Sequence, residues 1–186
     1  TSVLHHEPGL ELYVDFAGDT LSYIDMETGE MIKVQTFVST LACTDYAFVL
    51  CVPSQKTEDF LYALRRALEF YGGVPKIVVP DNLKAAVTRA DKYEPTINKA
   101  MEDMGNHYGF VVIPCQPAKP TQKSLVENQV QMIYHRIYAR LQHRQFFSLE
   151  ELNMAVHELL VRHNQTRMQQ RAYTREEHFH AVERMA

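Results

Sequence analysis

Three acidic residues stand where a purely structural role is hard to assign and where they could do chemistry. Asp15 interrupts an otherwise apolar stretch, and Asp81 directly follows the apolar run 77–79. Glu127 is the only acid between residues 116 and 147, where the other charges are positive. Three carboxylates gathered at one point would repel each other unless they bound cations, and oxygen ligands alone suit Mg²⁺ or Mn²⁺.

Two such ions, held about 3.5–4 Å apart, activate an attacking oxygen and stabilise a leaving oxygen in phosphodiester displacement. Each residue also has a simpler interpretation. Asp15 could be a rim or turn residue, and Asp81 in Pro-Asp-Asn could start a turn or cap a helix. Glu127 could be a helical ion-pair partner of Lys123, four residues earlier. Spacing alone therefore leaves both interpretations open.

The elements that would position these carboxylates are predicted from apolar periodicity. The first half of the chain has the alternation of strands and a hairpin turn at residues 27–30. The second half alternates helices with short, wholly apolar strands, which suits burial on both faces of a sheet. Strands are expected at 10–16, 21–26, 34–41, 46–52, 76–79 and 110–114. Helices are expected at 56–71, 96–108, 123–142 and 148–163, with a short one near 175–184.

This order predicts an α/β fold with a mixed sheet, antiparallel on one side and parallel on the other. Ligand sites in such sheets gather beyond the carboxyl ends of the strands. If the first strand and the strand at 76–79 are parallel neighbours, Asp15 and Asp81 lie side by side. Glu127 would then reach over them from the following helix.

Composition points to an ordinary globular chain. The 186 residues are 46% hydrophobic and 23% charged, and the longest apolar run, residues 46–52, is too short to span a membrane. Three cysteines without metal-ligand spacing, and no recognisable signal peptide, predict reduced thiols in a cytoplasm. The net charge of −4 argues mildly against a nucleic-acid partner.

The sequence around the carboxylates resembles the integrase core of DDE transposases and retroviral integrases, and most closely the IstA-type transposases of bacterial insertion sequences. The similarity covers residues 8–161, and its most specific part is a Pro-rich loop followed by Lys and by Val-Glu-Asn at a helix start. The matching stretches are residues 8–16, 79–87 and 107–128, the last interrupted at 110–113 and 121–122.

The resemblance implies an RNase H-like mixed five-stranded sheet flanked by helices, with a catalytic triad of Asp15, Asp81 and Glu127 that also binds two Mg²⁺ or Mn²⁺ ions when DNA is present. It implies a polynucleotidyl transferase that exposes a 3′-hydroxyl at a transposon end and then joins it to target DNA. The implied partners are transposon-end and target DNA, further copies of the protein, and a separate ATPase, in a bacterial cytoplasm.

Two features depart from the pattern of the relatives. Residues 82–126, 45 in number, separate Asp81 from Glu127, which is a longer gap than in the retroviral proteins. Gln122 stands where many relatives have Asp before the Lys that is Lys123 here. Neither departure removes a member of the triad, but any role for an acid at position 122 is in doubt.

DNA contacts are expected from cations and amides near the carboxylates, because phosphates attract Lys and Arg. Charge distribution matters more than the total, so a net negative domain can still hold DNA. The alternative is a solvated basic face on the helix at 123–142. The candidate DNA-binding residues are Lys84, Lys119, Lys123, Asn128, Arg136 and Arg140.

Functions other than strand transfer would also suit some of these residues. The same residues would suit an RNase H-like nuclease that cuts without joining, and a degenerate core could serve as a DNA-binding scaffold. A glycosidase is disfavoured because the chain has no Trp and no aromatic sugar platform. We expect a linker at 1–9, the catalytic core at 10–145 and a helical extension at 146–186.

Overall fold

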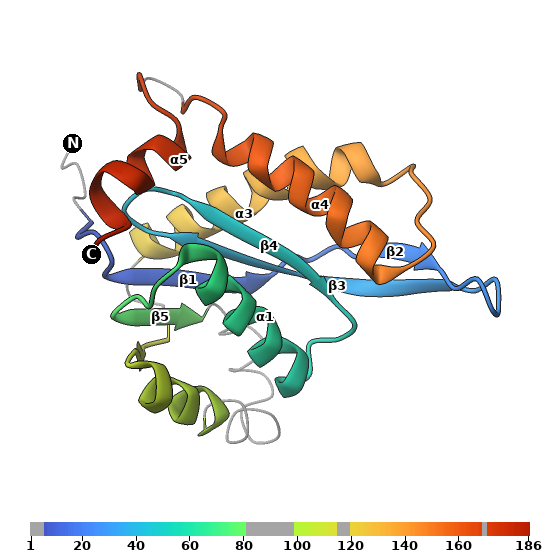
Figure 1. Ribbon diagram of the computed structural model, residues 1–186, viewed down its shortest axis with the longest axis horizontal. Coiled ribbons are helices and arrows are strands. Elements are labelled where there is room, and N and C mark those ends of the chain that lie inside the picture. Colours follow the sequence, from blue (N-terminus) through green and yellow to red (C-terminus); the bar gives the residue numbers. More distant parts are fainter. Residues whose placement is uncertain (1–5, 81–98, 115–119, 169–170) are drawn as a thin grey trace.

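A mixed sheet runs through the centre of the molecule (Figure 1). The computed structural model describes residues 6–80, 99–114, 120–168 and 171–186, and for residues 120–126 the backbone alone. The strands are β1 (Glu11–Phe16), β2 (Leu21–Ile24), β3 (Met31–Leu41), β4 (Ala47–Val52), β5 (Ile77–Pro80) and β6 (Val111–Val112). The helices are α1 (Thr57–Tyr71), α3 (Pro120–Leu141), α4 (Leu149–Asn164), α5 (Arg175–His178) and the π-helix η1 (Phe179–Glu183), and residues 99–108 are also helical.

The sheet has the expected division into antiparallel and parallel parts. β3 pairs antiparallel with β1, β2 and β4, whereas β5 pairs parallel with both β1 and β6. We expected five strands, and β4, β3, β1, β5 and β6 are joined in that order; β2 is a sixth, short strand on the first half of β3. The predicted α/β mixed sheet is confirmed.

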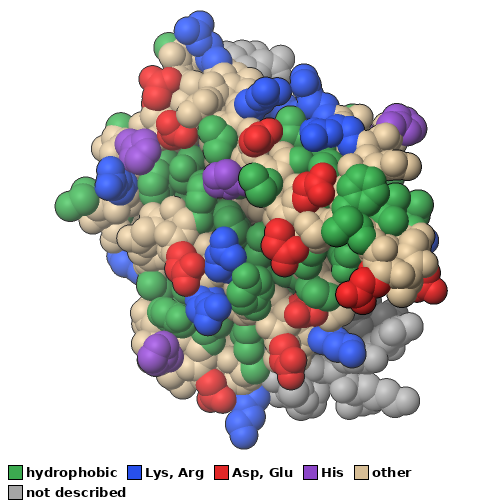
Figure 2. Space-filling view, turned by 45° about the vertical axis from the view of Figure 1, so that its right-hand side comes forward, with side chains coloured by type: hydrophobic (Ala, Val, Ile, Leu, Met, Phe, Trp, Pro, Cys, Tyr) green, Lys and Arg blue, Asp and Glu red, His purple; other side chains and the backbone are tan. Residues whose placement is uncertain are grey.

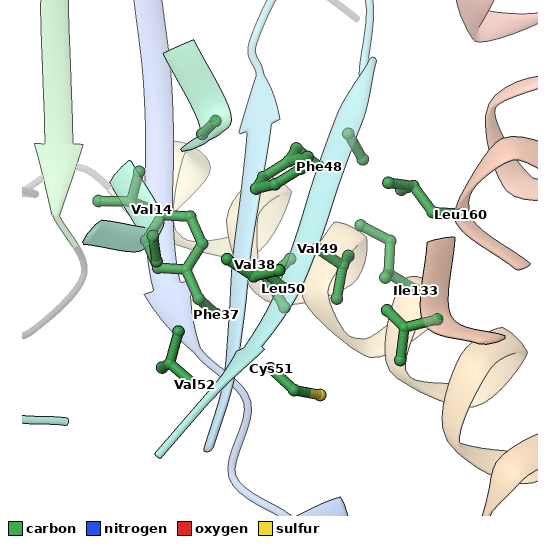
Figure 3. Close-up of a cluster of buried hydrophobic side chains, with 14 of the residues drawn as sticks. Val14, Phe37, Val38, Phe48, Val49, Leu50, Cys51, Val52, Ile133 and Leu160 are labelled. Carbon is green, nitrogen blue, oxygen red and sulfur yellow. The ribbon is translucent and has the colours of Figure 1, made fainter. Parts of the chain in front are cut away.

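Helices cover both faces of the sheet, with α1 in front of it and α3 behind it in Figure 1. On the α1 face, the ring of Phe60 lies 5.9 Å from that of Phe16 and 5.8 Å from that of Phe37. On the other face, Ile133 of α3 is buried near Val49 of β4 (Figure 3). The alternation of strand side chains therefore feeds two apolar layers, one on each side of the sheet.

α4 covers the edge of β4 opposite to the one that pairs with β3. The side-chain amide of Asn164 donates to the carbonyl of Ala47 (2.9 Å) and accepts from its N–H (3.1 Å). Asn153 does the same for Cys51, at 2.9 and 2.8 Å. Each asparagine thus replaces a residue of a missing neighbouring strand, which satisfies the edge and blocks pairing with another chain.

The C-terminal segment packs back onto the start of β1 and the turn between β3 and β4. The Glu183 carboxylate accepts hydrogen bonds from the Thr44 hydroxyl (2.6 Å) and the Gly9 N–H (2.8 Å). The ring of Phe179 stacks on that of Tyr46 with centroids 4.4 Å apart. Residues before and after position 145 share one buried cluster, and the division expected there stays a prediction about organisation.

A buried basic cluster joins α3, α4 and α5. His163 and Arg175 are only 2% and 3% exposed, and Arg136 Nη1 lies 3.1 Å from His163 Nδ1. Burial lowers the pKa of His163 to about 3, and the positive charges of Arg175 and Arg136 contribute to that shift. Because Arg can only donate, His163 is neutral here and accepts through Nδ1.

None of the helices within the described ranges is both long enough and apolar enough to cross a membrane.

Replacing Asn164 by Ala should destabilise the protein by about 2–4 kcal/mol, because it leaves the buried N–H and C=O of Ala47 without partners. Urea unfolding followed by circular dichroism measures the loss. Glu158→Ala, an exposed change on the same helix, should alter stability little. A loss in Asn164→Ala no greater than in Glu158→Ala would contradict the proposed edge pairing.

His163 should make the protein less stable as the pH falls. Its pKa is about 3 in the folded protein and about 6.5 in an unfolded chain. The unfolded state therefore binds a proton that the folded state does not, and this residue should cost about 2 kcal/mol between pH 7 and pH 5.

The variant His163→Gln should remove that part of the pH dependence, as measured by urea unfolding at both pH values. His157→Gln changes an exposed histidine on the same helix and should leave the dependence as it is. If the stability of His163→Gln falls between pH 7 and pH 5 as much as that of the unaltered protein, His163 does not cause this pH dependence.

Candidate active site

Asp15 lies near the carboxyl end of β1 and faces the side of the sheet opposite α1. Phe16, its neighbour, packs on Phe60 of α1, and side chains alternate along a strand. Tyr13 and Asp15 therefore share the other face. Asp15 is partly exposed, and its Oδ1 accepts a hydrogen bond from the Phe16 N–H at 2.7 Å. The apolar residues on either side of this carboxylate fix the strand while the carboxylate remains accessible.

The parallel pairing of β1 with β5 is the geometry on which the expected juxtaposition depends. Tyr13 pairs with Val79, and Val14 pairs with Pro80. The prediction that these two strands are parallel neighbours is confirmed. Asp81 is the next residue of the chain after Pro80, but it lies outside the described residues.

α3, which carries Glu127, lies over the same face as Asp15. Val130, one turn after Glu127, packs against the small buried cluster that Tyr13 and Val79 form. Tyr13 stands two residues before Asp15 and Val79 two residues before Asp81, so this contact seats the helix over both strands close to their carboxyl ends. Glu127 itself is partly exposed.

The structure describes two of the three residues of the expected metal-binding triad. Among the residues that the structure describes, no three His, Cys, Asp or Glu side chains could together hold a metal ion. Asp81, the third expected ligand, is not among them. Asp15 and Glu127 are placed on adjoining elements, and the full ligand set stays a prediction.

The candidate DNA-binding residues fall into three groups. Lys84 and Lys119 lie outside the described residues, as does the side chain of Lys123. Asn128 and Arg140 are exposed on α3. Arg136 is partly buried, with its guanidinium against His163.

The face of α3 that follows Glu127 carries fewer charged side chains than the number of cations in this helix suggests. An α-helix turns 100° per residue, so Arg136, nine residues after Glu127, points to the opposite side. The exposed residues on the side of Glu127 are Asn128, Gln131 and His135. Amides and an imidazole, rather than guanidinium groups, border this carboxylate along the described part of the helix.

A pair of tyrosines that the sequence analysis missed lies on α3, after Glu127. Burial, and to a lesser extent the neighbouring Asp19 and Tyr138, raises the pKa of the Tyr134 hydroxyl. The rings of Tyr134 and Tyr138 stack with centroids 4.6 Å apart and 20° between their planes. The spacing in the sequence could have indicated Tyr134, because it follows Glu127 by two helical turns and so shares its face of the helix. A tyrosine at such a position usually belongs to the core, however.

The chain resembles transposases of bacterial insertion sequences over most of its length. A protein of Burkholderia multivorans assigned as the transposase of IS408 is 40% identical over 160 residues, which are 86% of this chain and 31% of that protein. The corresponding protein of IS1162 from Pseudomonas fluorescens is also 40% identical, over 86% of this chain and 28% of its own length. The chain thus spans about a third of the length of these relatives.

Retroviral integrase cores share the fold. The catalytic core domain of HTLV-2 integrase, solved in complex with magnesium, superposes with a TM-score of 0.61 at 16% identity, covering 94% of this chain and 98% of that one. The catalytic core of BIV integrase gives a TM-score of 0.58 at 13% identity, covering 89% and 91% of the two chains. Their sheet and helices match the RNase H-like architecture expected here.

The family described as Integrase core domain matches residues 7–120, more than half of the chain, and this range includes β1 and β5 and the positions of Asp15 and Asp81 in the sequence. This chain therefore belongs to the integrase core domain family.

Proposed function

We propose that this chain is the catalytic core of an insertion-sequence transposase that cuts and joins DNA through Asp15, Asp81 and Glu127. The observation that supports it most directly is the parallel pairing of β1 with β5, covered by α3. This arrangement gathers the carboxyl ends of two strands beneath the helix that carries Glu127. Family membership and the similarity to transposases support the same function.

The donor set fits Mg²⁺ or Mn²⁺, because carboxylate oxygens are the ligands that these hard cations prefer. Two bound ions would supply activation of the attacking oxygen and stabilisation of the leaving one. Asp15 would be the most rigid ligand, since its strand pairs on both sides. Glu127 would approach from the helix, and its position depends on how α3 packs. The magnesium complex of the HTLV-2 integrase core agrees with this choice of ion.

The proposed reaction has two stages at one site. Water first breaks a phosphodiester bond at the transposon end and releases a 3′-hydroxyl. That hydroxyl then attacks a phosphodiester bond of the target, and the displaced 3′-oxygen leaves. The first stage hydrolyses one phosphodiester bond, and the second replaces one phosphodiester bond by another. Neither stage needs a covalent bond between DNA and the protein.

The DNA would be held mainly through its phosphates. Asn128 and Arg140 are exposed on α3 and accessible to DNA, whereas Arg136 would have to leave His163 to reach a phosphate. We propose the following residues for DNA contact: Lys84, Lys119, Lys123, Asn128, Arg136 and Arg140.

The complete protein should act as an oligomer, because two transposon ends must be brought to one target. A simian T-cell lymphotropic virus intasome, which covers 96% of this chain with a TM-score of 0.65, shows the same fold within such an assembly. A separate ATPase is the further partner that we propose. We place the complete protein in the bacterial cytoplasm with the nucleoid.

The proposal predicts that Asp15→Asn and Glu127→Gln each abolish both end cleavage and strand transfer by the complete transposase. Each change keeps the shape of the side chain and removes the charge that would bind the cation. The expected loss is at least about a thousandfold, as for removal of a catalytic group. Rates would be measured in Mg²⁺ on DNA that carries the transposon ends, with a plasmid as target.

Asp25→Asn, a change at a partly exposed residue in the turn after β2, is the matched control and should retain full activity. Cleavage without joining by the unaltered protein would instead indicate a nuclease of the same fold. Unchanged activity in either carboxylate variant would show that the triad is wrong, and DNA binding without any metal-dependent reaction would indicate a scaffold.

A further inference from the structure

Glu11, Tyr13 and Asp15 form a row on one face of β1. Successive side chains of a strand point to opposite faces, so every second residue shares a face and lies about 7 Å from the next one in the row. β1 pairs with β3 on one side and with β5 on the other, so its backbone is not able to turn and change this order. Tyr13 therefore stands midway between two carboxylates, one of which is the proposed metal ligand Asp15.

The Tyr13 hydroxyl binds the carboxylate that lies farther from the candidate active site. It donates a hydrogen bond to Glu11 Oε2 at 2.7 Å, a short distance that is typical of a hydroxyl donor and a charged acceptor. Tyr13 is only 3% exposed, whereas Glu11 is partly exposed. The buried phenol thus reaches towards the start of β1, in the direction away from Asp15.

The packing around Tyr13 agrees with this direction. Ile77 and Ala42 both pack against the small buried cluster that Tyr13 and Val79 form. Ile77 is the residue of β5 that pairs with Glu11, and the Ala42 N–H donates to the Glu11 carbonyl at 3.0 Å. Both apolar neighbours therefore lie at the Glu11 end of the row, which is the end that the hydroxyl of Tyr13 approaches.

We propose that Glu11 is a positioning residue: it holds the Tyr13 hydroxyl away from Asp15 and so keeps the Asp15 carboxylate available to a divalent cation. This inference rests on the proposed function, in which Asp15 is a metal ligand. Glu11 acts through Tyr13 and touches neither metal nor DNA in this role.

The physical reason is competition for the lone pairs of one carboxylate. Asp15 and Glu11 are equally far from Tyr13 along the strand, so both are acceptors that its hydroxyl could reach. A buried hydroxyl is costly to leave without an acceptor, so the loss of Glu11 should turn the hydroxyl of Tyr13 towards Asp15. A hydrogen bond to Asp15 would withdraw negative charge from the carboxylate, and it would have to break whenever a cation bound there.

The test is the affinity of the complete transposase for Mn²⁺, measured from the electron paramagnetic resonance signal of the unbound ion. Glu11→Ala removes the acceptor and should raise the Mn²⁺ dissociation constant about tenfold, the effect expected when one hydrogen bond to a charged group competes with the ion. The half-saturating Mg²⁺ concentration for end cleavage should rise by a similar factor. Thermal unfolding, followed in parallel, measures any accompanying loss of stability.

Further variants separate positioning from loss of stability or of charge. Tyr13→Phe removes the competing hydroxyl, so adding it to Glu11→Ala should restore Mn²⁺ affinity, whereas damage to the fold would not be repaired by a second change in the same contact. Glu11→Gln removes the charge but keeps an acceptor oxygen, and it should bind Mn²⁺ normally. The control is Glu7→Ala, which removes an exposed carboxylate that pairs with Lys76 and should leave Mn²⁺ affinity unchanged.

Unchanged Mn²⁺ affinity in Glu11→Ala would overturn the inference. A double variant that binds Mn²⁺ as weakly as Glu11→Ala would also overturn it, because Glu11 would then act through its own charge or through stability. Asp15→Asn tests the proposed function separately. If the unaltered protein shows no metal-dependent cleavage, or if Asp15→Asn is active, the proposed function fails before the effect of Glu11 is considered.

Discussion

The parallel pairing of β1 with β5 constrains nearly everything else in this structure. Parallel strands end at the same edge of a sheet, so the pairing of Val14 with Pro80 brings together two points that are distant in the sequence. Both faces of these strands must then be covered, since a parallel pair is stable only when helices shield it. α1 covers the face of Phe16, which leaves the face of Tyr13 and Asp15 to α3. That α3, the helix of Glu127, covers the face of Asp15 is thus a consequence of sheet topology.

Much of this arrangement could be predicted from the sequence because it depends on patterns that repeat. Apolar alternation predicted β1 and β4, and three-and-four spacing predicted α1, each to within a residue of its observed start. α4 also begins within a residue of its predicted start, and the Ser148 side chain caps it by accepting from the Glu151 N–H. The short apolar run before Asp81 identified β5 as a buried parallel strand.

The features that could not be predicted depend on contacts between residues far apart in the chain. Nothing in the local sequence around Asn153 or Asn164 indicates that their amides replace a strand neighbour along β4. Arg136 belongs to a run of cations that suggests a DNA-binding face, yet it contacts His163. The direction of a side chain on a helix is predictable from spacing, but its partner is known only when the neighbouring helix is placed.

The net charge of −4 is easier to reconcile with DNA once the side chains are placed. After Glu127, the exposed side chains described on its side of α3 are amides and an imidazole, which can hydrogen-bond a DNA backbone without adding strong attraction. Strong binding by the core alone would trap it on any DNA, since phosphate attraction is independent of sequence. In the relatives, the matched region is about a third of the protein, so most of their length lies outside this core.

Polar contacts follow one another through the helical layer, from the far edge of the sheet to α3. Asn153 and Asn164 fasten α4 to β4, and the Arg136–His163 contact joins α4 to α3. Apolar packing fills the space between these points without fixing orientation. A carboxylate on a helix can serve with one on a strand only if their relative orientation is set to a fraction of an ångström. Directional contacts contribute to that orientation, and the Arg136–His163 contact lies on the helix that carries Glu127.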